Sequence, residues 1–317
     1  MSTSKTPSTA DLPPVVAIVG PTAVGKTEIS LQVAERLNGE IVSADSRLFY
    51  RGMDIGTAKP TPAELARVPH HLIDVTGPER PWSLTMFQQA AAEAIAAIHA
   101  RGRLPLLVGG TGQYVKAVLE GWQPPSQPPD PRLRAELEKW AAEIGGDALH
   151  QRLAIVDPEA SGFIDARNVR RTIRALETVL HSGERFSAQR GRSAPPYQVL
   201  MIGLTRPRPE LYARVDARIQ AMLEAGFLDE VRGLMQRGCP PDSPALSAIG
   251  YREMAAVLRG EMTLEEAVIQ IKRLTRRYVR QQGAWFREED PTIHWFQADP
   301  SPVQEIVGLI RGKFSTS

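Results

Sequence analysis

Gly20-Pro-Thr-Ala-Val-Gly25-Lys26-Thr27 is the stretch of sequence that decides the fold. It matches the pattern Gly-x-x-x-x-Gly-Lys-Ser/Thr at every fixed position. Residues 15–19 before it are apolar, which predicts a buried strand, and residues 28–37 after it carry an apolar face, which predicts a helix. A strand, a glycine-rich loop and a helix in this order predict an α/β fold, with a parallel P-loop sheet flanked by helices.

The loop carries the groups needed to bind two linked phosphates. Successive backbone N–H groups converge on one point, and the N-terminus of the following helix adds partial positive charge. Lys26 adds a full charge, and the hydroxyl of Thr27 can ligate Mg²⁺, the cofactor that we expect. The predicted diphosphate-binding residues are Gly20, Pro21, Thr22, Ala23, Val24, Gly25, Lys26 and Thr27. The motif does not identify the molecule that carries the phosphates, although a nucleoside triphosphate is the common one.

The composition bounds the class of protein. A chain of 317 residues can form one large domain or two modest ones, and 42% hydrophobic with 23% charged residues is typical of a soluble globular protein. The single cysteine, Cys239, excludes an internal disulfide framework and a cysteine-rich zinc module, and it favours a reducing cytoplasm. The sequence contains no apolar run of the length that a membrane helix needs.

Asp45 follows a second predicted strand, residues 40–44. Ligands of parallel α/β sheets bind outside the carboxyl ends of the strands, so Asp45 is expected at the same crevice as the phosphate loop. A carboxylate there is a candidate general base for the group that accepts the transferred moiety. The alternative is that Asp45 only caps the turn that follows it.

Thr111 follows a third predicted strand, residues 104–108, within Gly109-Gly110-Thr111-Gly112. Most phosphate-loop NTPases have an acid at the end of such a strand to hold Mg²⁺, so its absence here weakens the NTPase interpretation. The flanking glycines let a ligand approach the backbone closely, with the Thr111 hydroxyl as donor or acceptor, although a plain turn would have the same sequence.

A mostly helical insertion is predicted at residues 122–197, between a core of residues 1–121 and 198–317. Residues 122–131 contain five prolines, which predicts a stiff linker, and three amphipathic helical patterns follow. Net charge is only +2, but residues 167–218 contain eleven arginines and four acids, and residues 272–287 contain six basic residues and no acid. Such stripes can follow a phosphate backbone, although solvated helix faces would give the same pattern.

These motifs and their order resemble the tRNA dimethylallyltransferases, also called tRNA isopentenyltransferases, of the bacterial type. The resemblance runs from about residue 15 to residue 287, and residues 50–59 (Tyr-Arg-Gly-Met-Asp-Ile-Gly-Thr-Ala-Lys) are its most specific part. The other motifs that carry it are residues 20–27, Asp45-Ser46, His70-His-Leu-Ile-Asp74, Gly109-Gly-Thr-Gly112 with Tyr114, Arg174-Ala-Leu-Glu177, Gly226-Phe227 with Glu230-Val231, and Ile249-Gly-Tyr-Arg252. Gln113, where the family usually has leucine, is a departure that leaves the chemistry alone.

The resemblance implies transfer of a dimethylallyl group from dimethylallyl diphosphate to N6 of the adenosine 3′ of the tRNA anticodon (position 37). It implies that Lys26 binds diphosphate oxygens, Asp45 takes a proton from N6 and Thr111 contacts the adenosine. Arg218, in preference to Arg214, would support the leaving diphosphate. The implied tRNA-binding residues are Asp45, Ser46, Arg47, Leu48, Thr111, Arg134, Arg170, Arg171, Thr172, Ile173, Arg174, Ser247, Ala248, Ile249, Gly250, Tyr251 and Arg252. We expect a cytoplasmic monomer that binds the anticodon stem-loop and no membrane.

Three other functions fit parts of the sequence. A small-molecule kinase would use the loop for ATP. However, this sequence lacks the acid expected after Val108, and a kinase of this kind has no use for a basic insertion. A prenyltransferase acting on free adenine nucleotides would share the chemistry, but the basic stripes favour RNA. An RNA-binding switch driven by a nucleotide would bind tRNA and modify nothing.

Overall fold

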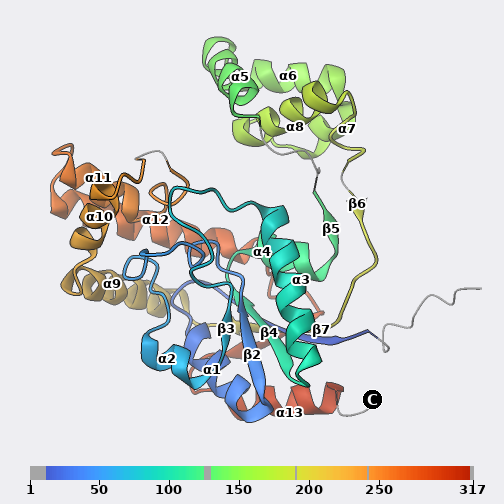
Figure 1. The fold of residues 1–317 in the computed structure, drawn as a ribbon, viewed down its shortest axis with the longest axis vertical. Helices are drawn as coiled ribbons and strands as arrows, with labels where there is room; N and C mark the ends of the chain where they lie inside the picture. The colour runs from blue at the N-terminus through green and yellow to red at the C-terminus, as the bar shows by residue number, and fades with distance from the viewer. Residues whose placement is uncertain (1–11, 125–129, 190, 241–242, 315–317) are drawn as a thin grey trace, which may run out of the picture. The chain divides into compact units, whose positions relative to one another are not determined.

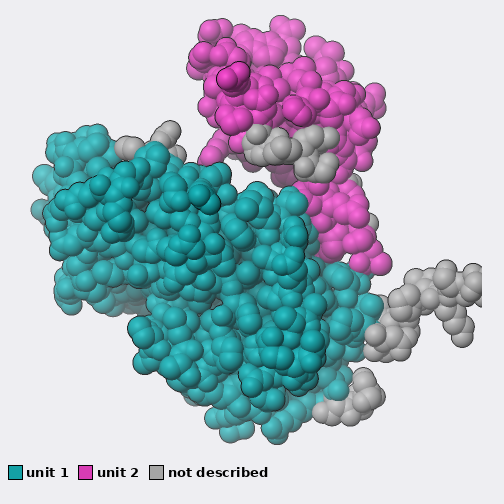
Figure 2. Space-filling view, viewed as in Figure 1, with its two compact units in different colours: residues 1–119, 195–317 teal, residues 120–194 magenta. Residues whose placement is uncertain are grey.

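The computed structural model describes residues 12–124, 130–189, 191–240 and 243–314. The middle of the predicted proline-rich linker, residues 125–129, therefore lies outside the described residues. The chain forms two compact units, one of Met1–Leu119 with Pro195–Ser317 and one of Glu120–Ala194, which Figure 2 colours separately. The sequence pattern predicts boundaries after residues 121 and 197.

The first unit is built on a parallel sheet. The described residues form six strands in the order β3-β2-β4-β1-β7-β8, and every pairing between neighbours is parallel (Figure 1). The strands are β1 (Pro14–Val19), β2 (Gly39–Ser43), β3 (His70–His71), β4 (Leu104–Gly109), β7 (Gln198–Thr205) and β8 (Ile293–Gln297). This arrangement confirms the predicted fold class.

Helices cover both faces of the sheet, as β1 shows most clearly. Val16 and Ile18 pack into one apolar cluster, with residues of α1 (Lys26–Leu37), α9 (Arg208–Glu224), α10 (Phe227–Gln236), α11 (Tyr251–Leu258), α12 (Leu264–Gly283) and α13 (Val303–Phe314). Val15, Ala17 and Val19 pack into a second cluster, with residues of α3 (Leu84–Ala100) and α4 (Gly112–Leu119). Successive strand residues point to opposite faces, so a central strand covered on both sides must be apolar throughout.

A buried carboxylate supports the sheet at the opposite end from the phosphate loop. Glu40 lies at the start of β2, and its side chain is only 2% exposed. It accepts hydrogen bonds from Arg101 at 2.7 Å and Arg103 at 3.1 Å, and it pairs with His71 at 2.6 Å. Hydrogen bonds from Arg101 and then His71, opposed by burial, hold the pKa of Glu40 at about 2. Glu40 is therefore a charged anchor far along the strand from Asp45.

The second unit is mostly helical. It contains α5 (Pro131–Ile144), α6 (Gly146–Val156), α7 (Pro158–Phe163), α8 (Val169–Ser182) and the short strands β5 (Trp122–Gln123) and β6 (Gly191–Arg192), which pair antiparallel. Leu137, Leu149 and Leu176 belong to its own apolar cluster. Buried Glu177 accepts hydrogen bonds from the backbone N–H of Asp130 and from two arginines, so this unit has an internal polar anchor as well as a core.

The remaining helix of the first unit is α2 (Pro62–Arg67), which begins at a capping box formed by Thr61 and Glu64. No helix of the described residues is both long and apolar enough to cross a membrane.

Candidate active site

The phosphate loop lies at the carboxyl end of β1 and leads directly into α1. Gly20 has a φ of +150°, and a Cβ there would lie 2.6 Å from the carbonyl oxygen of Leu204. Gly25, with a φ of +113°, occupies the N-cap position of α1 in the left-handed region and supplies no side-chain cap. Glycine avoids both the clash and the strain. The first turn of α1 therefore presents N–H groups that no cap side chain occupies, as an anion site requires.

Lys26 lies across this loop. Its Nζ donates hydrogen bonds to the carbonyl oxygens of Gly20 at 3.0 Å and Pro21 at 2.9 Å. Burial lowers the pKa of Lys26 to about 8, the charge of Asp45 raises it, and the charge of Arg218 lowers it further. The ammonium is thus poorly solvated and close to both groups, and a phosphate oxygen could replace the loop carbonyls as its partner.

Two arginines hold the carbonyl side of the loop. Nε of Arg214 donates to the carbonyl of Ala23 at 2.7 Å, and Nε of Arg206 donates to the carbonyl of Val24 at 2.9 Å. Arg206 has a side chain only 10% exposed, and it also donates to the carbonyl of Ala298 at 3.0 Å. By donating hydrogen bonds to these carbonyls, the two arginines fix the backbone of the loop. The sequence pattern does not indicate this role for Arg206.

Arg218 is half-buried, whereas Arg214 is exposed. Its Nη2 donates to the carbonyl of Thr57 at 3.2 Å. Burial lowers the pKa of Arg218, and the charge of Asp45 opposes that effect. Arg218 and Asp45 each influence Lys26, whereas Arg214 is exposed and contacts the loop from its carbonyl side. Of the two arginines considered from sequence, Arg218 therefore has the neighbours that a diphosphate-binding group needs.

Asp45 follows β2 directly, at the same edge of the sheet as the phosphate loop. Its Oδ1 accepts the backbone N–H of Arg47 at 3.0 Å, so the turn-capping role considered from sequence is present. The same carboxylate influences Lys26, Arg218 and Tyr278 electrostatically. Capping and participation in the site are therefore compatible, because a carboxylate offers two oxygens.

Gln282 of α12 joins the phosphate loop to the end of β4. Its Oε1 accepts the N–H and the hydroxyl of Thr22 at 2.9 and 3.2 Å, and its Nε2 donates to the carbonyl of Gly110 at 3.0 Å. A Cβ at Gly110 would lie 2.2 Å from Nε2 of Gln282, so only glycine admits this contact. Thr111 follows, and its Oγ1 is buried beside the phenol of Tyr278, without a hydrogen bond of good geometry to a described residue. Thr111 therefore has a hydroxyl available for a ligand.

Metal ligands are sparse in this region. Among the described residues, no group of three or more His, Cys, Asp or Glu side chains is placed to hold a metal ion. Thr27 is exposed in the first turn of α1, and Asp45 supplies carboxylate oxygens at the same edge of the sheet. Hard oxygen donors of this kind fit Mg²⁺ that is held largely by phosphate oxygens and water, as is usual for that ion.

Five residues implied as tRNA contacts are buried in this structure, and the tRNA-binding role implied for them stays a prediction. Thr172 and Ile173 are 0% and 4% exposed, because they lie on the inner side of α8. Ala248 and Tyr251 are 3% and 0% exposed, because they pack in the core of the first unit. Gly250 is also buried, at the N-cap of α11, with its N–H bonded to Glu253.

The other implied tRNA residues are at least partly accessible. Ser46, Arg47 and Leu48 are half-buried beside Asp45, and Nη1 of Arg47 donates to the carbonyl of Pro244 at 2.7 Å. Ser247 and Arg252 are exposed, and Ile249 is half-buried. In the helical unit, Arg170 and Arg171 are exposed, whereas Arg134 and Arg174 pair with Glu177 at 2.6 and 2.9 Å. These last two arginines stabilise the unit.

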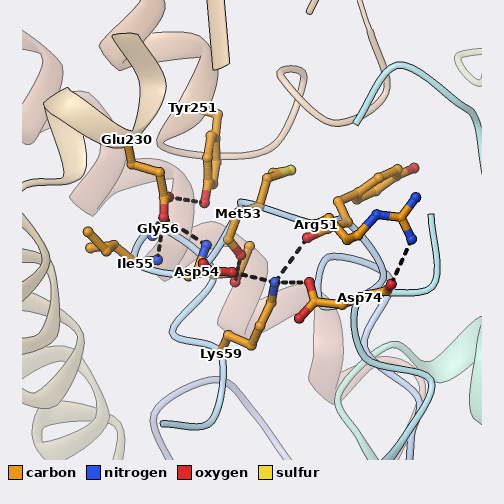
Figure 3. A network of polar contacts seen from close by, with 11 residues as sticks. Arg51, Met53, Asp54, Ile55, Gly56, Lys59, Asp74, Glu230 and Tyr251 are labelled. Atoms are coloured by element: carbon orange, nitrogen blue, oxygen red, sulfur yellow. Dashed lines mark hydrogen bonds and ion pairs between the residues drawn. The ribbon is translucent and has the colours of Figure 1, made fainter. Parts of the chain in front are cut away.

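The most specific stretch of the sequence, residues 50–59, folds as a loop around its own lysine. The side chain of Lys59 is 5% exposed and donates to the carbonyl of Tyr50 at 3.0 Å. It also pairs with the carboxylates of Asp54 and Asp74 (Figure 3). Lys59 therefore closes the loop internally and does not face a ligand.

Comparison with known proteins places the chain in a family. The family model described as IPP transferase matches residues 48–289, and one described as isopentenyl transferase matches residues 13–77. The tRNA dimethylallyltransferase of Roseiflexus sp. (strain RS-1) is 54% identical over 94% of this chain and 97% of its own length. That of Thermomicrobium roseum is 52% identical over 89% of this chain and 86% of its own length.

Solved structures agree. The crystal structure of the full-length tRNA isopentenylpyrophosphate transferase from Bacillus halodurans is 45% identical, with a TM-score of 0.71 over 95% of this chain and 97% of that one. A eukaryotic dimethylallyltransferase acting on tRNA, at 24% identity and a TM-score of 0.79, shares the fold. This chain belongs to the IPP transferase family, whose curated relatives are tRNA dimethylallyltransferases.

Proposed function

We propose that this chain transfers a dimethylallyl group from dimethylallyl diphosphate to N6 of the adenosine 3′ of the anticodon (position 37) in tRNA and releases diphosphate. The relatives named tRNA dimethylallyltransferase support the activity. One observation of this chain carries the assignment: two half-buried cations, Lys26 and Arg218, interact electrostatically with one carboxylate, Asp45, beside a glycine loop at a helix N-terminus. We place the reaction in the cytoplasm and expect the enzyme to act as a monomer.

The cations serve the leaving group. As the allylic C–O bond breaks, its electron pair stays with the diphosphate, where negative charge increases. Lys26, Arg218 and the N–H groups of the phosphate loop lie where that charge grows, so they stabilise the transition state more than the bound donor. Thr27 would hold Mg²⁺ against the diphosphate, and the ion would neutralise further charge on the phosphate oxygens.

Asp45 serves the nucleophile. The lone pair of N6 is delocalised into the adenine ring, so the amine is a poor nucleophile as long as it keeps both protons. As the N6–C bond forms, Asp45 accepts one N6 proton, and the product amine leaves neutral. We assign the hydroxyl of Thr111, at the neighbouring strand end and beside Tyr278, to the adenine edge.

The adenosine must leave its stack to reach such a site. A base in a single-stranded loop is extruded at lower cost than one in a duplex, which favours an anticodon loop as substrate. Arg170 and Arg171, exposed on α8, supply positive charge for the phosphates of the stem, and Ser247 and Arg252 are exposed on the first unit.

The test is incubation of the protein with radiolabelled dimethylallyl diphosphate, Mg²⁺ and total tRNA, followed by nucleoside analysis. Label in a modified adenosine supports the proposal, and a parallel reaction with free AMP tests the alternative of a nucleotide prenyltransferase. A small-molecule kinase is the other candidate, and it would turn over ATP. Consumption of ATP with no labelled nucleoside would refute the proposed function.

A further inference from the structure

Residues 54–56 are held by one carboxylate. Oε2 of Glu230 accepts the backbone N–H groups of Asp54 and Ile55, each at 2.7 Å. Oε1 accepts the N–H of Gly56 at 3.1 Å and the phenol of Tyr251 at 2.6 Å. Figure 3 shows all four donors converging on this side chain. Hydrogen bonds to a charged acceptor are about twice as strong as neutral ones, so Glu230 fixes the backbone of the loop.

The loop is also confined from outside. A Cβ at Gly56 would lie 2.1 Å from the ring of Phe227 and 2.7 Å from the ring of Tyr251, so the backbone is pressed against α10 and α11. Met53, just before it, is fully buried. The hydroxyl of Thr57 donates to the carbonyl of Met53 at 2.6 Å and closes the turn. Residues 53–57 therefore form a turn whose backbone is held in place mainly by Glu230.

The last residue of this turn contacts Arg218. The carbonyl of Thr57, one residue beyond the amide of Gly56 that Glu230 holds, accepts a hydrogen bond from Nη2 of Arg218 at 3.2 Å. A guanidinium has five donors in a planar fork, so one bond to a fixed carbonyl sets the direction of the remaining donors. The charge of Arg218 acts on Lys26, and the charge of Asp45 acts on both cations.

We propose that Glu230 is a positioning residue for the transfer reaction. It holds residues 54–57 so that the carbonyl of Thr57 turns the guanidinium of Arg218 toward the departing diphosphate. The inference rests on the proposed function, because it assigns Arg218 to that leaving group. It assigns a role in the reaction to Glu230 and to the loop of residues 54–57, which no sequence motif alone indicates.

Glu230→Gln tests the proposal. Glutamine keeps the volume and one acceptor oxygen, but its amide group would face backbone N–H groups or the phenol of Tyr251. With donor and tRNA saturating, we expect the single-turnover rate to fall about 10- to 100-fold, the loss that misplacement of a catalytic group by about 1 Å can cause. The KM for tRNA should stay unchanged, since Glu230 contacts no exposed tRNA-binding residue in this structure.

A double-mutant cycle separates positioning from general damage. In an Arg218→Ala background, Glu230→Gln should cause no further loss of rate, because no guanidinium remains to be positioned. Multiplicative losses would overturn the proposal. Glu40→Gln is the control: it alters a different hydrogen-bonded carboxylate of the same unit, at the far end of β2, and should lower the melting temperature without lowering the rate. An equal rate loss in Glu40→Gln would assign the effect to destabilisation and overturn the proposal.

Tyr251→Phe provides a second route if Glu230→Gln does not fold. It removes only the phenol that fixes Oε1 of Glu230 and should give a weaker form of the same pattern, again abolished in Arg218→Ala. A folded Tyr251→Phe enzyme whose loss persists in Arg218→Ala contradicts the proposal. A wild-type protein that forms no modified adenosine removes the proposed function and this inference together. If the wild-type protein is active and the Glu230→Gln variant keeps the full rate, only this inference is refuted.

Discussion

Lys26 should make the binding of dimethylallyl diphosphate depend on pH between pH 7 and 9. Burial lowers the pKa of Lys26 to about 8 in the free protein. An ammonium with this pKa is about nine-tenths protonated at pH 7 and about one-tenth protonated at pH 9. Because the diphosphate binds the ammonium and not the neutral amine, the association constant should fall about tenfold over that interval.

The assay is equilibrium binding of dimethylallyl diphosphate at pH 7, 8 and 9, at fixed ionic strength and Mg²⁺ concentration. Lys26→Arg is the control, because a guanidinium stays protonated throughout and its binding curve should be flat over this range. A flat profile for the wild-type protein would refute the reasoning. So would the same slope in Lys26→Arg, because the titrating group would then lie elsewhere.

The neighbours of Lys26 give the prediction a sign that can be checked independently. Asp45 raises the pKa of Lys26, and Arg218 lowers it. Asp45→Asn should therefore move the midpoint of the binding profile below pH 8, and Arg218→Ala should move it above pH 8. If both substitutions shifted the midpoint in the same direction, the two charges would not have opposite effects on the pKa of Lys26, and the reasoning would be wrong.

Three further results are expected. Asp45→Asn should lower the single-turnover rate about 10²- to 10⁴-fold, as loss of a general base does, and should leave the affinity for tRNA unchanged. A rate measurement and a filter-binding titration check the two expectations. An unchanged rate would show that Asp45 takes no part in the chemistry. Gln282→Ala should lower the free energy of unfolding by about 2–4 kcal/mol in urea titration, at about 1 kcal/mol for each of its three hydrogen bonds. It should also weaken donor binding, whereas exposed Gln281→Ala should do neither; equal effects would disprove the link between the loops. Reversing the charge of Arg170 and Arg171 should weaken tRNA binding and flatten its salt dependence, by about one unit of slope per lost phosphate contact, and an unchanged slope would place the stem elsewhere.

The elements that sequence reasoning predicted are those with a local signal. The apolar run before the phosphate loop is β1, and the strand before Asp45 is β2, because a buried parallel strand needs apolar residues on both faces. The sequence pattern does not indicate the strand β8, because Ile293-His-Trp-Phe-Gln has mixed polarity and lies at the edge of the sheet. The helix α4 was not predicted, because it begins at Gly112, a residue that normally indicates a turn.

The site divides along a similar line. Lys26, Asp45 and Thr111 could be found because each follows a predicted strand end or belongs to the phosphate motif. Gln282 and Arg206 could not, because their partners are backbone atoms 260 and 182 residues away in the chain. Contacts of that kind leave no periodicity or spacing in the sequence, so only the fold identifies them.

Burial separates two kinds of motif residue that sequence similarity treats alike. Tyr251 and Lys59 belong to the motifs that carry the family resemblance, yet Tyr251 is fully buried and Lys59 closes its own loop. The phenol of Tyr251 meets Glu230, and the ammonium of Lys59 meets the carbonyl of Tyr50 and the carboxylates of Asp54 and Asp74. A buried polar group is costly unless it is hydrogen-bonded, so such a network is kept only where a defined backbone is needed. The backbone that it defines ends at the carbonyl that holds Arg218. We infer that the family motifs around residues 54–57 serve to position the guanidinium of Arg218. Substitutions there should therefore lower the transfer rate before they lower the affinity for tRNA.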